Sequence, residues 1–223
     1  MTPLKEIGEV GISDSREGGK DYLLRPSFEA MTRIGEPGEI VSTFVAVHEY
    51  DAEKLHDSCV ECFGEVQPWI TSVVNRISEE RLSKAIDVLQ ACCDEDLTEL
   101  VGEWIACGHQ ISYKPGIMPA SEIVIFAQQL MHHGVVGKAK VRRLQRHESN
   151  TGTSEFRAFE YINAARIHFD MSLDEARTLT MTEFQNLLAE KYPDQKGLTK
   201  EEYSDVADDF LAKQAARRAA AKK

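Results

Sequence analysis

The sequence lacks the motifs that mark the commonest catalytic and nucleotide-binding sites. It contains no G-x-S-x-G nucleophile elbow, no P-loop, no H-E-x-x-H zinc motif and no G-x-G-x-x-G fingerprint. Its many aspartate and glutamate residues form no recognisable catalytic pair. We therefore expect a protein that is not an enzyme, that has no catalytic residues and that needs no cofactor.

Long hydrophobic runs are also missing from the sequence. No window of about eighteen consecutive apolar residues occurs, so we expect no membrane-spanning helix. The N-terminal segment has no apolar stretch of the kind that a secretory signal contains. An apolar fraction of 42% is nonetheless enough for a packed core. These features predict a protein that works in the cytoplasm.

Cysteine is scarce, and an odd number of five argues against a secreted disulfide framework. Cys59 and Cys62 form a C-x-x-C motif, which together with Cys107 and His109 could make a zinc site. A second C-x-x-C pair is missing, however, and sequence spacing alone does not bring these residues together. We therefore expect reduced thiols and no bound metal.

The alternative interpretation of the C-x-x-C motif is structural. Leu55, Cys59, Cys62 and Phe63 share one face of a predicted helix, where cysteine behaves as a small apolar residue. Of the adjacent thiols at positions 92 and 93, we expect one to be buried and the other to be partly exposed. We favour this structural interpretation over a zinc site.

The two adjacent histidines lie at the predicted end of a helix. His132 and His133 directly precede Gly134, which we expect to terminate that helix. A protonated imidazole is stabilised by the dipole at a helix C-terminus, so the sequence predicts a capping role. A metal role would need carboxylates at ligand spacing, and these are missing.

Charge is distributed unevenly along the chain. The net charge of −11 argues against nucleic-acid binding, which requires neutralisation of phosphates. Residues 36–103 contain sixteen acidic and four basic side chains, whereas residues 134–147 contain five basic side chains and no acidic one. Such polarity can steer a partner or a second copy of the chain, although solvated helix faces would give the same pattern.

The basic run consists of Lys138, Lys140, Arg142 and Arg143. These side chains could contact phosphate, but no aromatic residues are interleaved with them, so stacking on single-stranded nucleic acid is not supported. We expect the run to meet an acidic surface instead. The acidic segment 36–103 of another copy or of a partner would serve.

The sequence predicts a mainly α fold that begins with a short β-hairpin. Residues 4–12 and 20–25 have strand-like character around the glycine pair at positions 18 and 19. Apolar periodicity and capping signals then predict a series of helices at residues 26–34, with Pro26 in the first turn, and at 37–47, 51–63, 78–89, 97–107 and 119–133. Residues 109–119 contain prolines and a glycine, so we expect an irregular, exposed loop there.

The best-specified stretch of the chain runs from Phe156 to Pro193. It contains two capping boxes, Ser172 with Glu175 and Thr180 with Glu183. A third box, Thr199 with Glu202, opens a further predicted helix. The polar segment 147–154 precedes this region, so we predict an N-terminal helical domain at 1–146, a linker at 147–154, and a small C-terminal helical unit with a basic tail at 155–223.

Three segments together carry a resemblance to a known family. They are PSFEAMTRIGEPGEIV at 26–41, YKPGIMPASEIVIFAQQLMHHGVVGK at 113–138, and FRAFEYINAARIHFDMSLDEARTLTMTEFQNLLAEKYP at 156–193. With them, the chain resembles the tail assembly chaperones of long, non-contractile-tailed bacteriophages. The motifs are loose and helical, with no catalytic signature.

The resemblance implies an assembly function in the cytoplasm of an infected bacterial cell. The partner would be the tape measure protein, whose long amphipathic helix such chaperones cover while they recruit tail tube subunits. Self-association along the tape measure would fit this role, as would a longer frameshifted product, and neither membrane nor nucleic acid would be involved. The alternatives are a zinc-binding regulatory or adaptor protein of a phage and a minor structural protein of the tail.

The candidate partner-binding residues are aromatic and apolar side chains of the C-terminal unit, together with the basic run 138–143. An all-α protein can bind an amphipathic helix in an apolar groove, which such side chains would line. The competing interpretation, which we favour for most of them, is that they form the core of their own unit, because each lies on a helical stripe. The candidates are Phe156, Phe159, Tyr161, Phe184 and Leu188.

Overall fold

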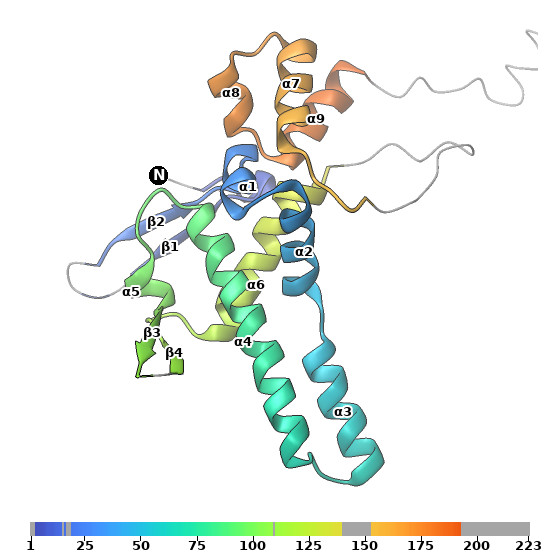
Figure 1. The fold of residues 1–223 in the computed structure, drawn as a ribbon. Helices are drawn as coiled ribbons and strands as arrows, with labels where there is room; N and C mark the ends of the chain where they lie inside the picture. The colour runs from blue at the N-terminus through green and yellow to red at the C-terminus, as the bar shows by residue number, and fades with distance from the viewer. Residues whose placement is uncertain (1–2, 15, 17–18, 109, 140–152, 193–223) are drawn as a thin grey trace, which may run out of the picture. The chain divides into compact units, whose positions relative to one another are not determined.

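The computed structural model describes residues 3–14, 16, 19–108, 110–139 and 153–192, and this part of the chain is mainly α (Figure 1). None of its helices combines the length and apolarity that a membrane span requires. The helical elements are η1 (Lys5–Ile7), α1 (Phe28–Ile34), α2 (Pro37–His48), α3 (Asp51–Phe63), α4 (Pro68–Ala91), α5 (Thr98–Val101), α6 (Ala120–Met131), η2 (His132–Val136), α7 (Ala158–Phe169), α8 (Leu173–Thr178) and α9 (Met181–Lys191).

The predicted N-terminal β-hairpin is present. Strand β1 (Val10–Ser13) pairs antiparallel with β2 (Asp21–Leu24), and Ile12 lies opposite Tyr22. The strands are shorter than the predicted ranges because residues 5–7 form the turn η1. Alternate side chains of β2 face the core, so Tyr22 and Leu24 are buried.

Helix α2 begins at Pro37 as predicted, but the prediction that Pro26 lies in the first turn of the first helix is wrong, because α1 begins at Phe28 and Ser27 is its N-cap. The Ser27 hydroxyl accepts a hydrogen bond from the Ala30 amide at 3.1 Å, which satisfies one of the free amides of the first turn of α1. Pro37 occupies the first turn of α2, where its missing N–H costs nothing. A capping box between Glu36 and Glu39 completes that start.

Helix α4 is longer than the sequence indicated. We predicted that Ser78 begins a helix after a short apolar piece, and this is wrong, because α4 is continuous from Pro68 to Ala91. No glycine or proline interrupts it after its first residue, and the buried Ile70 and Leu82 belong to the same helix. The first half of α4 pairs with α3 as a helical hairpin, while its second half packs against α6 and α2 (Figure 1).

The helix predicted at residues 97–107 is wrong. Helix α5 is a single turn that stops at Gly102, whose φ of +86° is unfavourable for other residues. Strand β3 (Glu103–Cys107) follows and pairs antiparallel with β4 (Gln110–Lys114), so the predicted irregular loop at 109–119 contains a strand. The rings of Trp104 and Tyr113, 5.2 Å apart, reinforce this hairpin as a cross-strand pair.

Helix α6 begins after Pro119 as predicted, but it does not end at Gly134. The π-helical segment η2 continues to Val136, and Gly137, with a φ of +83°, ends it. Gly134 serves a different purpose, because a Cβ atom there would lie 2.7 Å from the Met31 sulfur. The glycine therefore allows η2 to approach α1 closely.

The C-terminal helices follow their capping boxes. The amide of Glu175 donates to the Ser172 hydroxyl at 3.2 Å while the Glu175 carboxylate accepts from the Ser172 amide at 2.9 Å, and Thr180 and Glu183 make the same reciprocal pair. Both boxes are thus confirmed. The third predicted box, at Thr199 and Glu202, lies outside the described residues.

Helices from the two ends of the described chain share one core. The buried Phe28 ring of α1 lies 5.7 Å from Tyr161 and 5.9 Å from Phe184, measured between ring centroids. Residues up to Ala189 accordingly form one compact unit, and residues 190–223 form a second unit, of which only the first three are described. The predicted linker 147–154 lies mostly outside the described residues, and the predicted division into domains at 1–146 and 155–223 stays a prediction.

Candidate functional site

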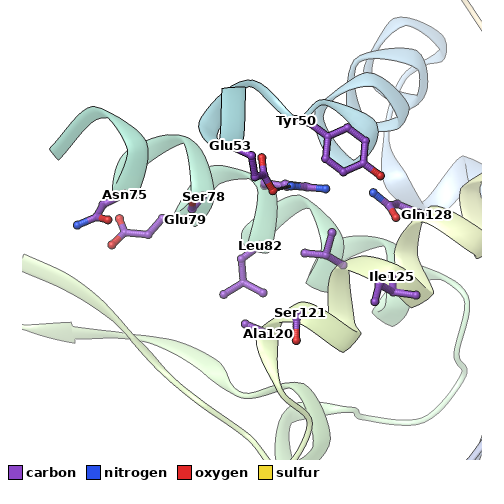
Figure 2. Close-up of a pocket in the computed structure, with 12 residues that line it drawn as sticks. Tyr50, Glu53, Asn75, Ser78, Glu79, Leu82, Ala120, Ser121, Ile125 and Gln128 are labelled. Carbon is purple, nitrogen blue, oxygen red and sulfur yellow. Dashed lines mark hydrogen bonds and ion pairs between the residues drawn. The ribbon is translucent and has the colours of Figure 1, made fainter. Parts of the chain in front are cut away.

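A groove of about 490 Å³ lies between α4 and α6 (Figure 2). Its lining is predominantly apolar. Leu82 of α4 and Val124 and Ile125 of α6 are its aliphatic side chains, and Tyr50 and Glu53 border it at the start of α3. We name the surface lined by these helices the α4/α6 groove.

Helical spacing explains why two faces meet in this groove. On α6, Ser121, Val124, Ile125 and Gln128 follow at intervals of three or four residues, so they lie on one face of the helix. The opposite face, which includes Ile123, packs into the core with no exposed surface. On the groove side of α6, Val124 is partly buried against the core, and Ile125 stays exposed in the described chain.

Small side chains keep the groove open. Ala120 and Ser121 at the start of α6 and Ser78 on α4 do not reach across it, while Leu82 points into the space between the helices (Figure 2). Ile125 is 54% exposed, which is a high value for an isoleucine on a helix that packs into a core. A partner that covered this side chain would gain the free energy of its removal from water.

One end of the groove is held by a network around Arg81. Its Nη1 atom lies 2.7 Å from Oε1 of Glu53, its Nε donates to the Val47 carbonyl at 3.3 Å, and its guanidinium lies 5.0 Å from the centre of the Tyr50 ring. The Gln128 amide donates to the same Val47 carbonyl at 2.8 Å. These bonds fix the polar end of the groove before any partner arrives.

The chemistry of the groove suits binding. Its lining contains carboxylates, a guanidinium, amides and hydroxyls, but no histidine or cysteine. An apolar strip with a few polar groups at its margins is typical of surfaces that receive an amphipathic helix. The groove is thus able to cover apolar side chains and to orient them through polar groups at its rim.

The aromatic residues predicted as partner contacts are mostly inside the core. Phe156 and Phe184 are buried, and Tyr161 and Leu188 are partly buried and packed against the core cluster. Phe159 alone among the five is largely exposed, at 61%, and it lines a smaller hollow of about 290 Å³ between α1, α7 and α8. A contact role for these side chains stays a prediction.

Little of the predicted basic contact can be located. Lys138 is exposed, and its ammonium group donates to Oε1 of Gln129 at 2.7 Å. Lys140, Arg142 and Arg143 lie outside the described residues. The predicted meeting of this run with an acidic surface therefore stays a prediction.

The two cysteines of the C-x-x-C motif do not share a face. Cys59 is buried against α4, and its thiol donates to the Glu65 carbonyl at 3.4 Å, whereas Cys62 and Phe63 are exposed. The predicted common face is therefore wrong beyond Cys59. In the described part of the chain no three metal-binding side chains gather, and the Cys107 side chain and His109 lie outside it.

The adjacent cysteines are both buried. We predicted that one of Cys92 and Cys93 is partly exposed, and this is wrong. They follow the last turn of α4, which ends in the centre of the core. Burial raises the pKa of both thiols, so both are held in the protonated form at neutral pH.

The predicted capping role of the histidine pair is also wrong. Burial lowers the pKa of His132 below its ordinary value and lowers the pKa of His133 to about 4, so both rings are neutral at pH 7. His133 is buried, and its Nδ1 atom lies 2.9 Å from the hydroxyl of Thr182. The amide of Lys138 donates to that hydroxyl at 3.1 Å. His133 thus joins η2 to α9.

Protonation of His133 should destabilise the fold. Its pKa of about 4 in the folded chain lies below the ordinary value of about 6.5 in the unfolded chain, so the unfolded chain takes up a proton first as the pH falls. We expect this residue to remove about 2–3 kcal/mol from the free energy of unfolding between pH 7 and pH 4. Urea unfolding of the wild type and of His133→Gln at both pH values measures the difference. An equal loss in the two proteins would contradict it.

Sequence reasoning missed the α4/α6 groove. The apolar stripe that predicts the helix after Pro119 consists of Ile123, Phe126, Ala127, Leu130 and Met131, of which Phe126 is partly buried and the others are buried. It left Val124 and Ile125 unexplained, and these are two apolar residues on the adjacent face. Apolar residues beside the main stripe of one helix could thus have predicted an additional contact surface.

Comparison with known proteins identifies a family but gives no function. A family model described as "Family of unknown function (DUF6246)" matches residues 24–205, which is most of the chain. Neither the curated proteins nor the solved structures gave a match. The matched range includes every helix that borders the α4/α6 groove. The chain therefore belongs to the DUF6246 family.

Proposed function

We propose that this chain is a tail assembly chaperone of a long, non-contractile-tailed bacteriophage. It binds the tape measure protein in the cytoplasm of the infected cell and covers apolar surface of that protein while the tail assembles. Contact with tail tube subunits and self-association along the tape measure belong to the same proposal. The observation that carries it is the preformed apolar groove between α4 and α6.

Three features support the proposal. The three segments that resemble tail assembly chaperones include the start of α2 and the whole of α6, so part of the resemblance falls on the groove itself. The groove is open along two helices, which suits an elongated helical ligand. A tape measure helix would present a continuous apolar stripe, and such a stripe aggregates unless it is covered.

Co-expression tests the proposal directly. We expect the wild-type chain to keep the tape measure protein of the same phage in the soluble fraction and to co-purify with it. Ile125→Glu places a carboxylate in the apolar strip, where it would be desolvated by a bound helix, so it should reduce the recovered tape measure protein about tenfold or more.

A matched control is available on α7. Ile167 is 80% exposed and does not line the groove, so Ile167→Glu introduces the same charge on an exposed helix face. Recovery with this variant should equal that with the wild type. If the tape measure protein stayed insoluble with the wild-type chain, or if both variants reduced recovery equally, the proposal would lose its support.

A further inference from the structure

We propose that the α4/α6 groove selects an amphipathic helix that carries lysine or arginine along one side of its apolar stripe. This inference rests on the proposed helix-binding function and specifies the chemistry of the partner. The apolar strip formed by Leu82, Val124 and Ile125 defines where the stripe lies. The arrangement of charge around that strip defines which helix fits.

The carboxylates of the groove lie along only one of its sides. Glu53 comes from α3 and Glu79 from α4, whereas the α6 side contributes Ser121 and Gln128, which are uncharged (Figure 2). Helix α6 contains no lysine or arginine at all. Its one charged side chain, Glu122, is exposed but does not line the groove, so a bound helix would meet carboxylates of the lining beside one flank of its stripe and uncharged lining groups beside the other.

The guanidinium in the lining does not cancel this charge toward a ligand. Arg81 has a side chain only 13% exposed, and its donors are engaged with Glu53 and with the Val47 carbonyl. The Glu53 side chain is 54% exposed, so its carboxylate still faces solvent. Glu79, which is exposed, makes no ion pair with any described residue. Two carboxylates thus remain accessible, and one of them is uncompensated.

The surrounding helices are acidic overall. Together α3, α4 and α6 contain eight acidic and four basic side chains. Charge complementarity of this kind raises the rate of association and excludes partners of the wrong sign, because like charges brought together in a groove are costly. The groove therefore discriminates between helices that have the same apolar stripe but opposite flanking charges.

Two synthetic helical peptides of about eighteen residues test the selection. Both carry the same leucine stripe, and the flanking positions on one side of it are lysine in the first and glutamate in the second. We expect the full chain to bind the lysine peptide about tenfold more tightly in fluorescence anisotropy at low salt, with the preference reduced at high salt. Equal affinities for the two peptides would overturn the inference.

A pair of charge-reversal variants separates local recognition from the general attraction of an acidic protein. Glu79→Lys should weaken binding of the lysine peptide about fivefold or more and strengthen binding of the glutamate peptide. Glu160→Lys changes the net charge equally but lies on α7, away from the groove, and should alter both affinities less than about twofold. Equal effects of the two variants would show that net charge alone attracts the peptide and would overturn the inference.

Two further outcomes have defined meanings. If the wild type sedimented as a dimer and Ile125→Glu dissociated it, the groove would be occupied by a second copy of the chain, and the inference would be overturned. If the lysine peptide bound with the expected dependence on Glu79 while the tape measure protein remained insoluble, the proposed function would fail and the selection of a basic helix would stand.

Discussion

Replacing Phe28 with alanine should lower the free energy of unfolding by about 3–5 kcal/mol. The ring has no exposed surface, and it contacts Tyr161 and Phe184 from the C-terminal helices. The substitution removes apolar surface burial and leaves a cavity between α1, α7 and α9, because the surrounding helices can close only part of the space. Urea unfolding monitored by circular dichroism gives the difference directly.

Phe159→Ala is the matched control for this prediction. It removes the same ring from α7, but that ring is 61% exposed, so we expect a loss within about 0.5 kcal/mol. The comparison separates burial in the shared core from any general effect of losing an aromatic side chain. Equal losses for the two variants would contradict the view that Phe28 joins the two regions.

Replacing Arg25 with methionine should lower the free energy of unfolding by about 3 kcal/mol. Its guanidinium pairs with Glu9, binds both carboxylate oxygens of Glu183 at 2.8 and 2.9 Å, and donates to the Thr178 carbonyl at 2.9 Å. Methionine has a similar reach but no charge, so among the described residues the buried Glu9 carboxylate would keep only its hydrogen bond from the Leu4 amide. A buried charge that loses its partner is strongly destabilising.

Arg33→Met provides the comparison for that loss. Arg33 pairs at 2.7 Å with Asp94, whose side chain is 86% exposed, so solvent already screens the interaction. We expect this variant to lose no more than about 1 kcal/mol. Thermal unfolding of the three proteins at neutral pH would rank them, and a smaller loss for Arg25→Met than for Arg33→Met would contradict the proposed importance of Glu9 burial.

The parts of the fold that sequence could predict are those set by local chemistry. Pro37, Ser172 and Thr180 act within the turn in which they stand, through a fixed φ angle and two capping boxes, so their effects can be read without a tertiary structure. The β3–β4 hairpin was missed for the opposite reason. Trp104 and Cys107 lie at helical spacing from Leu97 and Val101, and only the backbone geometry at Gly102 breaks that pattern.

The candidate site was harder to predict than the fold. Aromatic residues such as Phe156 and Phe184 are obvious candidates for partner contacts in a sequence. In the structure they are buried in the core, because their large rings bury the most apolar surface. A groove depends instead on which apolar residues are left over when every helix has packed. Ile125 is such a residue. It can be recognised as an apolar side chain without a core contact only when the buried face of α6 is known.

The pairing of Phe28 with Phe184 has a consequence for the synthesis of the protein. Ser27 and Thr180 form an isolated β-bridge beside this contact, and the Phe28 amide donates to the Leu179 carbonyl at 2.8 Å. Contacts so distant in sequence cannot form while the later residues are still inside the ribosome. A nascent chain therefore carries an uncovered α1 until most of its length has emerged, and a fragment that stops before α9 would leave that helix open to aggregation.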